Sequence, residues 1–141
     1  MSADPIAALP AAVRAFASRH GIGPDAVRSD GRLTLTVDKR YRIHLQASTH
    51  NRVALVSQLM TLPAPGRPSA DQVLERLLKA ATGLMREHPS GLCIDPKLQS
   101  VLLQQTLPAD ADAGAVEKAI ADFSNALAFW SPLCAAESAQ L

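Results

Sequence analysis

The residues that could perform chemistry in this 141-residue chain are few and far apart in the sequence. A metal site needs three or four ligands that converge, whereas the four histidines fall on different expected elements and lack a paired spacing. Phosphate-binding loops, nucleophile elbows and zinc-protease motifs do not occur in the sequence. Asp110 and Asp112 stand at the start of an expected helix, where carboxylates stabilise the helix dipole. We therefore predict no catalytic residue, no metal and no enzyme activity; the histidines are His20, His44, His50 and His88.

Cys93 and Cys134 are the two cysteines of the chain. Two cysteines make neither a disulfide framework nor a zinc site, so we expect buried, reduced thiols. The sequence that follows Met1 has no basic segment leading into an apolar one, as a secretory signal would have. No window approaches the ~20 apolar residues of a membrane-spanning helix. These features predict a soluble, cytoplasmic protein without a membrane span.

A cluster of basic residues is the most distinctive charged feature of the sequence. It could be an ordinary solvated hairpin, a docking site for an acidic partner segment, or a surface of a small nucleic-acid or regulatory binding module. A nucleic-acid surface would interleave the charges with stacking aromatics, yet Tyr41 is the only aromatic residue there and is expected on the opposite strand face. Nucleic acid is therefore the less favoured partner. The cluster consists of Arg32, Lys39, Arg40, Arg42 and Arg52.

The composition predicts one packed domain over residues 1–141, with flexible ends at 1–9 and 132–141. Hydrophobic residues make up 48% of the chain and charged residues 19%, which excludes a disordered polyelectrolyte. The net charge is +1, but it is unevenly distributed. Residues 1–70 hold nine basic and four acidic side chains, whereas residues 71–141 hold five basic and nine acidic ones. The two halves of the chain therefore carry opposite charge.

The elements that must position these residues follow from the periodicity of apolar residues. The first three expected strands form an antiparallel meander, with Val53, Leu55, Ser57 and Leu59 on one face of the third. The element order is α-β-β-β-α-β-β-α, which defines an α+β fold with a single antiparallel sheet and three helices. The first expected helix either starts at Pro10 and runs to 20 or begins as a short turn at Pro5 that is kinked at Pro10. The other expected helices are 69–86 and 112–131, and the expected strands are 32–37, 41–46, 53–59, 92–94 and 100–107.

The expected helix at 69–86 has an unusually wide apolar stripe. Val73 and Leu74 lie side by side on it, as do Leu77 and Leu78. A domain with one small sheet can cover such a stripe with its own strands or with a second copy of itself. Because two-fold dimers are the commonest self-association, we expect a homodimer.

The order and spacing of these segments resemble the class I type III secretion chaperones, the Tir chaperone (CesT/SycE-like) family. The resemblance covers about residues 30–130. It is carried by hydrophobic spacing and not by catalytic signatures. The segments that carry it are LTLTV at 33–37, YRIHL at 41–45, VLERLLKAA at 73–81, GLCID at 91–95 and the final helix with Phe123, Leu127 and Trp130.

The resemblance implies a function as well as a fold. Members are bacterial cytoplasmic homodimers that bind the N-terminal segment of a secreted effector and keep it secretion-competent. They use no cofactor, catalyse no reaction and present their cargo to the secretion apparatus, whose ATPase is a further implied partner. Members are typically acidic, whereas this chain is nearly neutral because of its basic first half.

The resemblance also implies two sets of site residues. The second helix and the strand after it would build the dimer interface, and the first helix and the sheet would bind the effector. The implied interface residues are Leu74, Leu77, Leu78, Ala81, Leu92 and Ile94. The implied effector-binding residues are Val13, Phe16, Leu33, Leu35, Ile43 and Leu45, together with Arg40 and Arg42 of the basic cluster.

Overall fold

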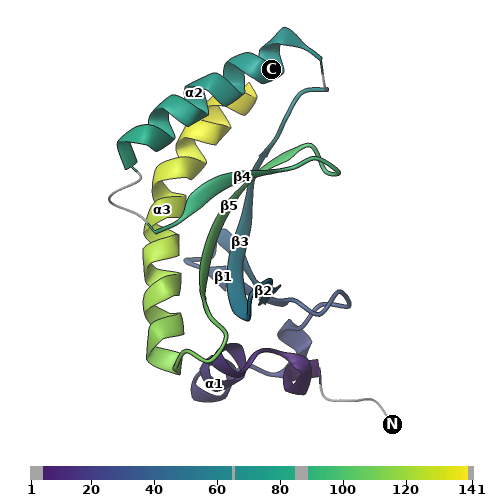
Figure 1. Cartoon of the computed structure of the whole chain (residues 1–141), viewed down its shortest axis with the longest axis vertical. Helices are drawn as coiled ribbons and strands as arrows, with labels where there is room; N and C mark the ends of the chain where they lie inside the picture. Colours follow the sequence, from purple (N-terminus) through teal and green to yellow (C-terminus); the bar gives the residue numbers. More distant parts are fainter. Residues whose placement is uncertain (1–4, 65, 85–88, 140–141) are drawn as a thin grey trace.

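The computed structural model describes residues 5–64, 66–84 and 89–139, and it has the predicted α+β fold (Figure 1). Three α-helices accompany a single five-stranded sheet of order β1-β2-β3-β5-β4, and every neighbouring pair of strands is antiparallel. The helices are α1 (Ala11–Arg19), α2 (Pro68–Leu84) and α3 (Ala113–Ala139), and the strands are β1 (Leu33–Val37), β2 (Tyr41–Ser48), β3 (Arg52–Thr61), β4 (Gly91–Asp95) and β5 (Ser100–Pro108). Two short 3-10 helices lie at Pro5–Ala8 and Pro24–Ala26.

The predicted meander of the first three strands is confirmed. Asp38 and Lys39 adopt positive φ angles in the turn between β1 and β2, and His50 and Asn51 do so between β2 and β3. Left-handed residues of this kind give a hairpin turn the twist that the flanking strands require. The register that results pairs Leu33 with Leu45, and so places the apolar side chains of both strands on one face of the sheet.

That apolar face carries the core of the protein. α3 lies along the sheet, α1 packs at one end of α3 and α2 at the other (Figure 1). Arg19 of α1 reaches Glu117 of α3, with 3.2 Å between Nη1 and Oε1. Fully buried side chains from the helices and the strands meet between these layers, among them Val13, Leu33, Ile43, Leu45, Leu55, Leu103 and Phe123.

The inward row of β3 departs from strict alternation. Leu59 was expected to continue this row, but a β-bulge between Gln58 and Met60 shifts the register. Met60 therefore pairs with Val101 and is buried, while Leu59 is only half-buried. A bulge adds one residue to a strand, bends it and increases its twist, which is the reason that the period-two prediction fails here.

The last helix continues beyond its expected end. Ser131 and Pro132 were expected to terminate it, because an interior proline lacks the N–H for the bond to the carbonyl four residues earlier. α3 instead runs through Pro132 to Ala139. Cys134 on the added turns is fully buried, and Glu137 accepts hydrogen bonds from Arg76 of α2 at 2.7 and 2.5 Å. These tertiary contacts hold the turns in place.

Much of the two ends expected to be flexible has regular structure. Residues 132–139 are helical, Pro5–Ala8 form a turn of 3-10 helix, and Leu9 is buried. Residues 1–4 and 140–141 of the two expected ends lie outside the described part of the chain, as does the predicted helical residue Arg86. In the described part, no helix is both long enough and apolar enough to cross a membrane.

Candidate binding surfaces

The histidines do not converge in the structure. His20 lies 2.7 Å from Glu117 Oε1, and His44 Nδ1 lies 2.9 Å from the hydroxyl of Thr34. His50 occupies the tight turn before β3, and His88 is outside the described residues. In the described ranges, no three His, Cys, Asp or Glu side chains gather where they could hold a metal ion.

The remaining candidates for chemistry have structural roles. Asp112 caps α3, since its Oδ1 accepts a hydrogen bond of 2.8 Å from the backbone N–H of Ala115. Both cysteines are free: Cys93 is half-buried on β4, and Cys134 is buried on α3. Burial, followed by the charge of Glu137, raises the pKa of the Cys134 thiol to about 11, so this thiol stays protonated at neutral pH.

An apolar groove between α2 and β4, the α2–β4 groove, is one surface open to a partner. Its volume is about 290 Å³, and nearly all of its lining is apolar. Leu78 and Ile94 remain 62% and 48% exposed, which is unusual for large apolar side chains. The groove brings together five of the six residues predicted for a dimer interface; it is lined by Leu74, Leu77, Leu78, Leu92, Cys93, Ile94 and Val101. The sixth, Ala81, is half-buried and packs against the core cluster.

A second apolar groove, the α1–α3 groove, has a volume of about 420 Å³. Phe16 of α1, Val37 of β1 and Ile120 of α3 supply its apolar lining. Glu117 stands at its rim, where hydrogen bonds from His20 and Arg19 hold the pKa of the carboxyl below its usual value. The groove is therefore a shallow apolar surface with an ion pair at its edge.

Four of the predicted effector-binding residues are part of the core. Val13 of α1 and the strand residues Leu33, Ile43 and Leu45 have no exposed surface, because they meet in the core between the helices and the sheet. Their assignment to a partner surface is corrected accordingly. Phe16 borders the α1–α3 groove at 7% exposure, and Leu35 is half-buried. The other two predicted residues, Arg40 and Arg42, are exposed.

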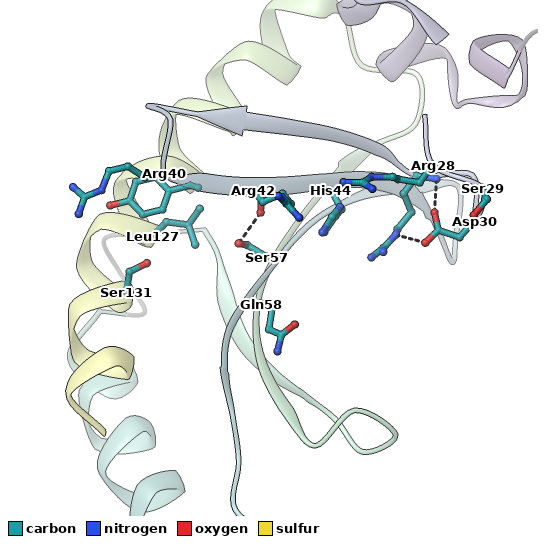
Figure 2. Close-up of a pocket in the computed structure, with 12 residues that line it drawn as sticks. Arg28, Ser29, Asp30, Arg40, Arg42, His44, Ser57, Gln58, Leu127 and Ser131 are labelled. Carbon is teal, nitrogen blue, oxygen red and sulfur yellow. Dashed lines mark hydrogen bonds and ion pairs between the residues drawn. The ribbon is translucent and has the colours of Figure 1, made fainter. Parts of the chain in front are cut away.

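The third surface, the arginine groove, has a volume of about 750 Å³ and lies where β2 and β3 separate. Figure 2 shows Ser57 and Gln58 of β3 below β2, Ser131 of α3 towards one end and Asp30 towards the other. Ser57 Oγ donates a hydrogen bond of 2.8 Å to the backbone oxygen of Arg42. The lining comprises Arg28, Ser29, Asp30, Arg32, Arg40, Tyr41, Arg42, His44, Ser57, Gln58, Leu127 and Ser131.

The charges of the arginine groove are unevenly paired. Arg32 binds Asp30 through its Nε at 2.8 Å, and its backbone N–H also donates to this carboxyl, so the pKa of Asp30 is lowered. Burial and then the charges of Arg32 and Arg28 lower the pKa of His44. Lowering the pKa disfavours the imidazolium form, so positive charge in the groove comes from the arginines.

The groove contains only part of the predicted basic cluster. Arg52 lies at the other end of β3 and donates to Thr106 Oγ1 at 3.0 Å, and Lys39 does not line the groove. Arg28 was not predicted as a member, because a turn closed by hydrogen bonds between residues 28 and 32 brings it to the groove. Tyr41 alternates with the buried Ile43 and Leu45 and packs against the core, as expected, but it also borders the groove, and the Arg40 guanidinium lies 5.8 Å from its ring centre.

The described residues thus form an antiparallel sheet with open grooves on its surface, and no cluster of metal ligands gathers among them. The chain belongs to the Tir chaperone protein (CesT) family, whose sequence profile matches residues 11–131. The resemblance seen in the sequence is thereby confirmed. No curated protein matches the chain significantly.

Solved structures with the same fold include several protein complexes. The HopA1–SchA chaperone–effector complex contains a chain with 17% identity and a TM-score of 0.61, over 83% of this chain and 88% of that one. A chain of the ExsC–ExsE complex has 18% identity and a TM-score of 0.60, over 84% of this chain and 87% of that one. A chain of the ExoU–SpcU complex of the Pseudomonas aeruginosa type III secretion system has 15% identity and a TM-score of 0.58, over 84% of this chain and 93% of that one. At these identities the likeness establishes the fold.

Proposed function

We propose that this protein is a bacterial cytoplasmic chaperone of a type III secretion system. It binds the N-terminal segment of a secreted effector and keeps that segment stable and secretion-competent. Membership of the Tir chaperone protein (CesT) family is the observation that carries the proposal. In this role residues 1–141 act as one chaperone domain that needs no cofactor and catalyses no reaction.

The likeness to solved complexes supports the proposal, because one of them is a chaperone–effector complex. No finding supports the alternative of a nucleic-acid or regulatory binding module. An extended effector segment pays ordering entropy when it binds, so it needs many shallow contacts spread over a large surface. The α1–α3 groove offers such contacts through Phe16, Val37 and Ile120.

A homodimer built across the α2–β4 groove completes the proposal. The groove leaves Leu78 and Ile94 in water in a single chain, and a second copy would cover them. Two copies also double the surface that an effector can wrap around. The ATPase of the secretion apparatus is the partner that would receive the loaded dimer.

The proposal is tested by affinity capture from the native bacterium, identification of the bound protein, and co-expression of its N-terminal region with this chain. We expect a stable complex in which the captured region resists limited proteolysis. Ile120→Glu in the α1–α3 groove should abolish that protection. Leu133→Glu is the matched control on the same helix, since Leu133 is 39% exposed and outside the groove. A chain that captures no secreted protein, or that leaves the captured region as protease-sensitive as before, would refute the proposal.

A further inference from the structure

The arginine groove carries an excess of positive charge that the described part of the chain does not neutralise. Arg28, Arg40 and Arg42 are exposed and form no ion pair with a described residue, and the one carboxylate of the lining, Asp30, is already bound to Arg32. Like charges held together on one surface repel each other, so an anionic partner would be attracted there. A partner with several carboxylates or phosphates fits this requirement.

The backbone around the groove favours a polypeptide as that partner. β2 pairs with β3 only between Ser48↔Arg52 and His44↔Val56, whereas β3 remains paired with β5 as far as Thr61. Beyond Val56 no ladder pairing joins the described residues of β3 to β2, and Ser57 reaches β2 through its side-chain hydroxyl, which donates to the backbone oxygen of Arg42. The bulge at Gln58 bends β3 at the same place, which accounts for the separation. Unpaired strand edges present N–H and C=O groups that another extended chain can match.

The spacing of charge along β2 fits an extended segment as well. Arg40 lies in the turn directly before β2 and Arg42 lies within the strand, and two residues of extended chain span about 7 Å. An extended chain with an acidic residue at every second position repeats its carboxylates at that same interval. Single-stranded nucleic acid fits less well, because it stacks its bases on aromatic rings. The described lining has no Phe or Trp, and its tyrosine, Tyr41, already has Arg40 against its ring.

We propose that the arginine groove binds an extended acidic segment of the effector, whose carboxylates pair with Arg28, Arg40 and Arg42. The inference rests on the proposed chaperone function and assigns a second, charge-selective contact beside the apolar ones. It gives a role to the basic first half of the chain. It also gives the protein a basis for choosing among effectors, because a segment without acidic residues would leave these arginines unpaired.

The test uses the full-length protein and a fluorescent ten-residue peptide in which Asp or Glu alternates with Thr or Val. Binding is followed by fluorescence anisotropy at low and at physiological salt. We expect the triple variant Arg28→Gln, Arg40→Gln, Arg42→Gln to bind the peptide about tenfold more weakly than the wild type, since it loses three charge-assisted contacts. Its affinity should also depend less steeply on salt.

A matched variant controls for net charge. Arg14→Gln, Arg67→Gln, Lys97→Gln removes the same charge from exposed positions outside the groove and should change the affinity less than about twofold. Amide shifts in the NMR spectrum of the wild type should change at residues 28–32, 40–44 and 57–58 when the peptide is added. Equal loss of affinity in the two triple variants would overturn the proposal, as would shifts confined to α2 and β4. Tighter binding of a ten-nucleotide single strand than of the peptide would also overturn it.

The acidic-segment inference and the chaperone function can be disproved independently of each other. If the groove variant still protects the captured effector region as well as the wild type does, the acidic-segment inference is wrong and the chaperone function stands. If the wild type captures no effector, the chaperone function is wrong whatever the peptide does.

Discussion

Gln105 projects from the core face of β5 beside Leu55 and is 6% exposed, and its Oε1 has no hydrogen-bond partner in the described part of the chain. A buried acceptor without a partner costs about 1–3 kcal/mol of stability. Gln104, the residue before it, lies on the opposite face of the sheet and accepts a hydrogen bond from Cys93 Sγ at 3.5 Å. These adjacent glutamines therefore form an internal comparison at the level of single residues.

Gln105→Met is expected to stabilise the protein by about 1 kcal/mol, because methionine has a similar shape and needs no hydrogen bond. The gain would appear as a higher urea midpoint with an unchanged slope. Gln104→Met should bring no gain, since it removes an acceptor that is in use. A loss of stability in Gln105→Met would show that Oε1 is satisfied in solution.

The two thiols should differ in their reaction with iodoacetamide at mildly alkaline pH. Cys134 is fully buried and its pKa is raised to about 11, so it should react only when the protein unfolds. The pKa of Cys93 is raised less, by burial and by the charge of Asp95, and this thiol lines the open α2–β4 groove. Mass spectrometry of the native protein should therefore show modification at Cys93 first. Modification of Cys134 at a similar rate would contradict the packing of α3.

Glu117 should make the stability depend on pH in the acid range. Its pKa lies below the ordinary value of 4.5 because His20 and Arg19 donate hydrogen bonds to the carboxylate. A carboxyl with a lowered pKa stabilises the fold above its unfolded pKa, and that contribution disappears as the pH falls through the folded pKa. The melting temperature of the wild type should therefore exceed that of Glu117→Gln near pH 5.5. The two should converge near pH 3, and a constant difference would contradict the assignment.

At the level of whole elements, α3 and α2 have properties that isolated residues do not reveal. The turns of α3 after Pro132 follow a residue that normally ends helices, and they are held by the burial of Cys134 and by the pairing of Glu137 with Arg76. α2 faces the core with Val73 and Leu77 but leaves Leu78 in water. Both helices therefore depend on tertiary or intermolecular contacts for part of their stability.

Deletion of residues 132–141 is expected to destabilise the protein by about 2–4 kcal/mol. The deletion removes the buried Cys134, uncovers Trp130 and leaves Arg76 without its partner. Urea denaturation measures the loss. A truncation after Ala139, which keeps every described residue, is the control. Equal stability of the two truncated proteins would mean that the added turns contribute nothing.

Leu78→Asp is expected to convert the proposed dimer into a monomer, because it places a charge in the α2–β4 groove. Light scattering after size-exclusion chromatography gives the mass directly. Leu98→Asp is a close control: Leu98 is also 62% exposed but does not line the groove. A wild type that is monomeric, or a Leu98→Asp protein that dissociates equally, would contradict the proposed interface.

At the level of the whole molecule, the fold could be predicted because apolar periodicity identifies each element, and short turns leave few ways to connect the strands. The wide stripe with Leu77 and Leu78 indicated an uncovered side of α2, whereas only the family resemblance placed Leu92 and Ile94 of β4 beside it. The apolar side chains that stay open to a partner were not predictable. Leu35 and Leu45 look alike in sequence, and only the distant packing of α1 and α3 decides which of them is buried. The bulge at Gln58 likewise leaves no signal in the local pattern.

The length of α3 has one more consequence. Its 27 residues extend over roughly 40 Å. Ile120 of this helix borders the α1–α3 groove, and Leu127 borders the arginine groove. Glu137 binds Arg76 of α2. A segment that crossed both the α1–α3 groove and the arginine groove would be held at two points along the same helix. The distance between its apolar anchor and its acidic anchor would then be fixed, and the protein would select cargo by the interval between the two as well as by their chemistry.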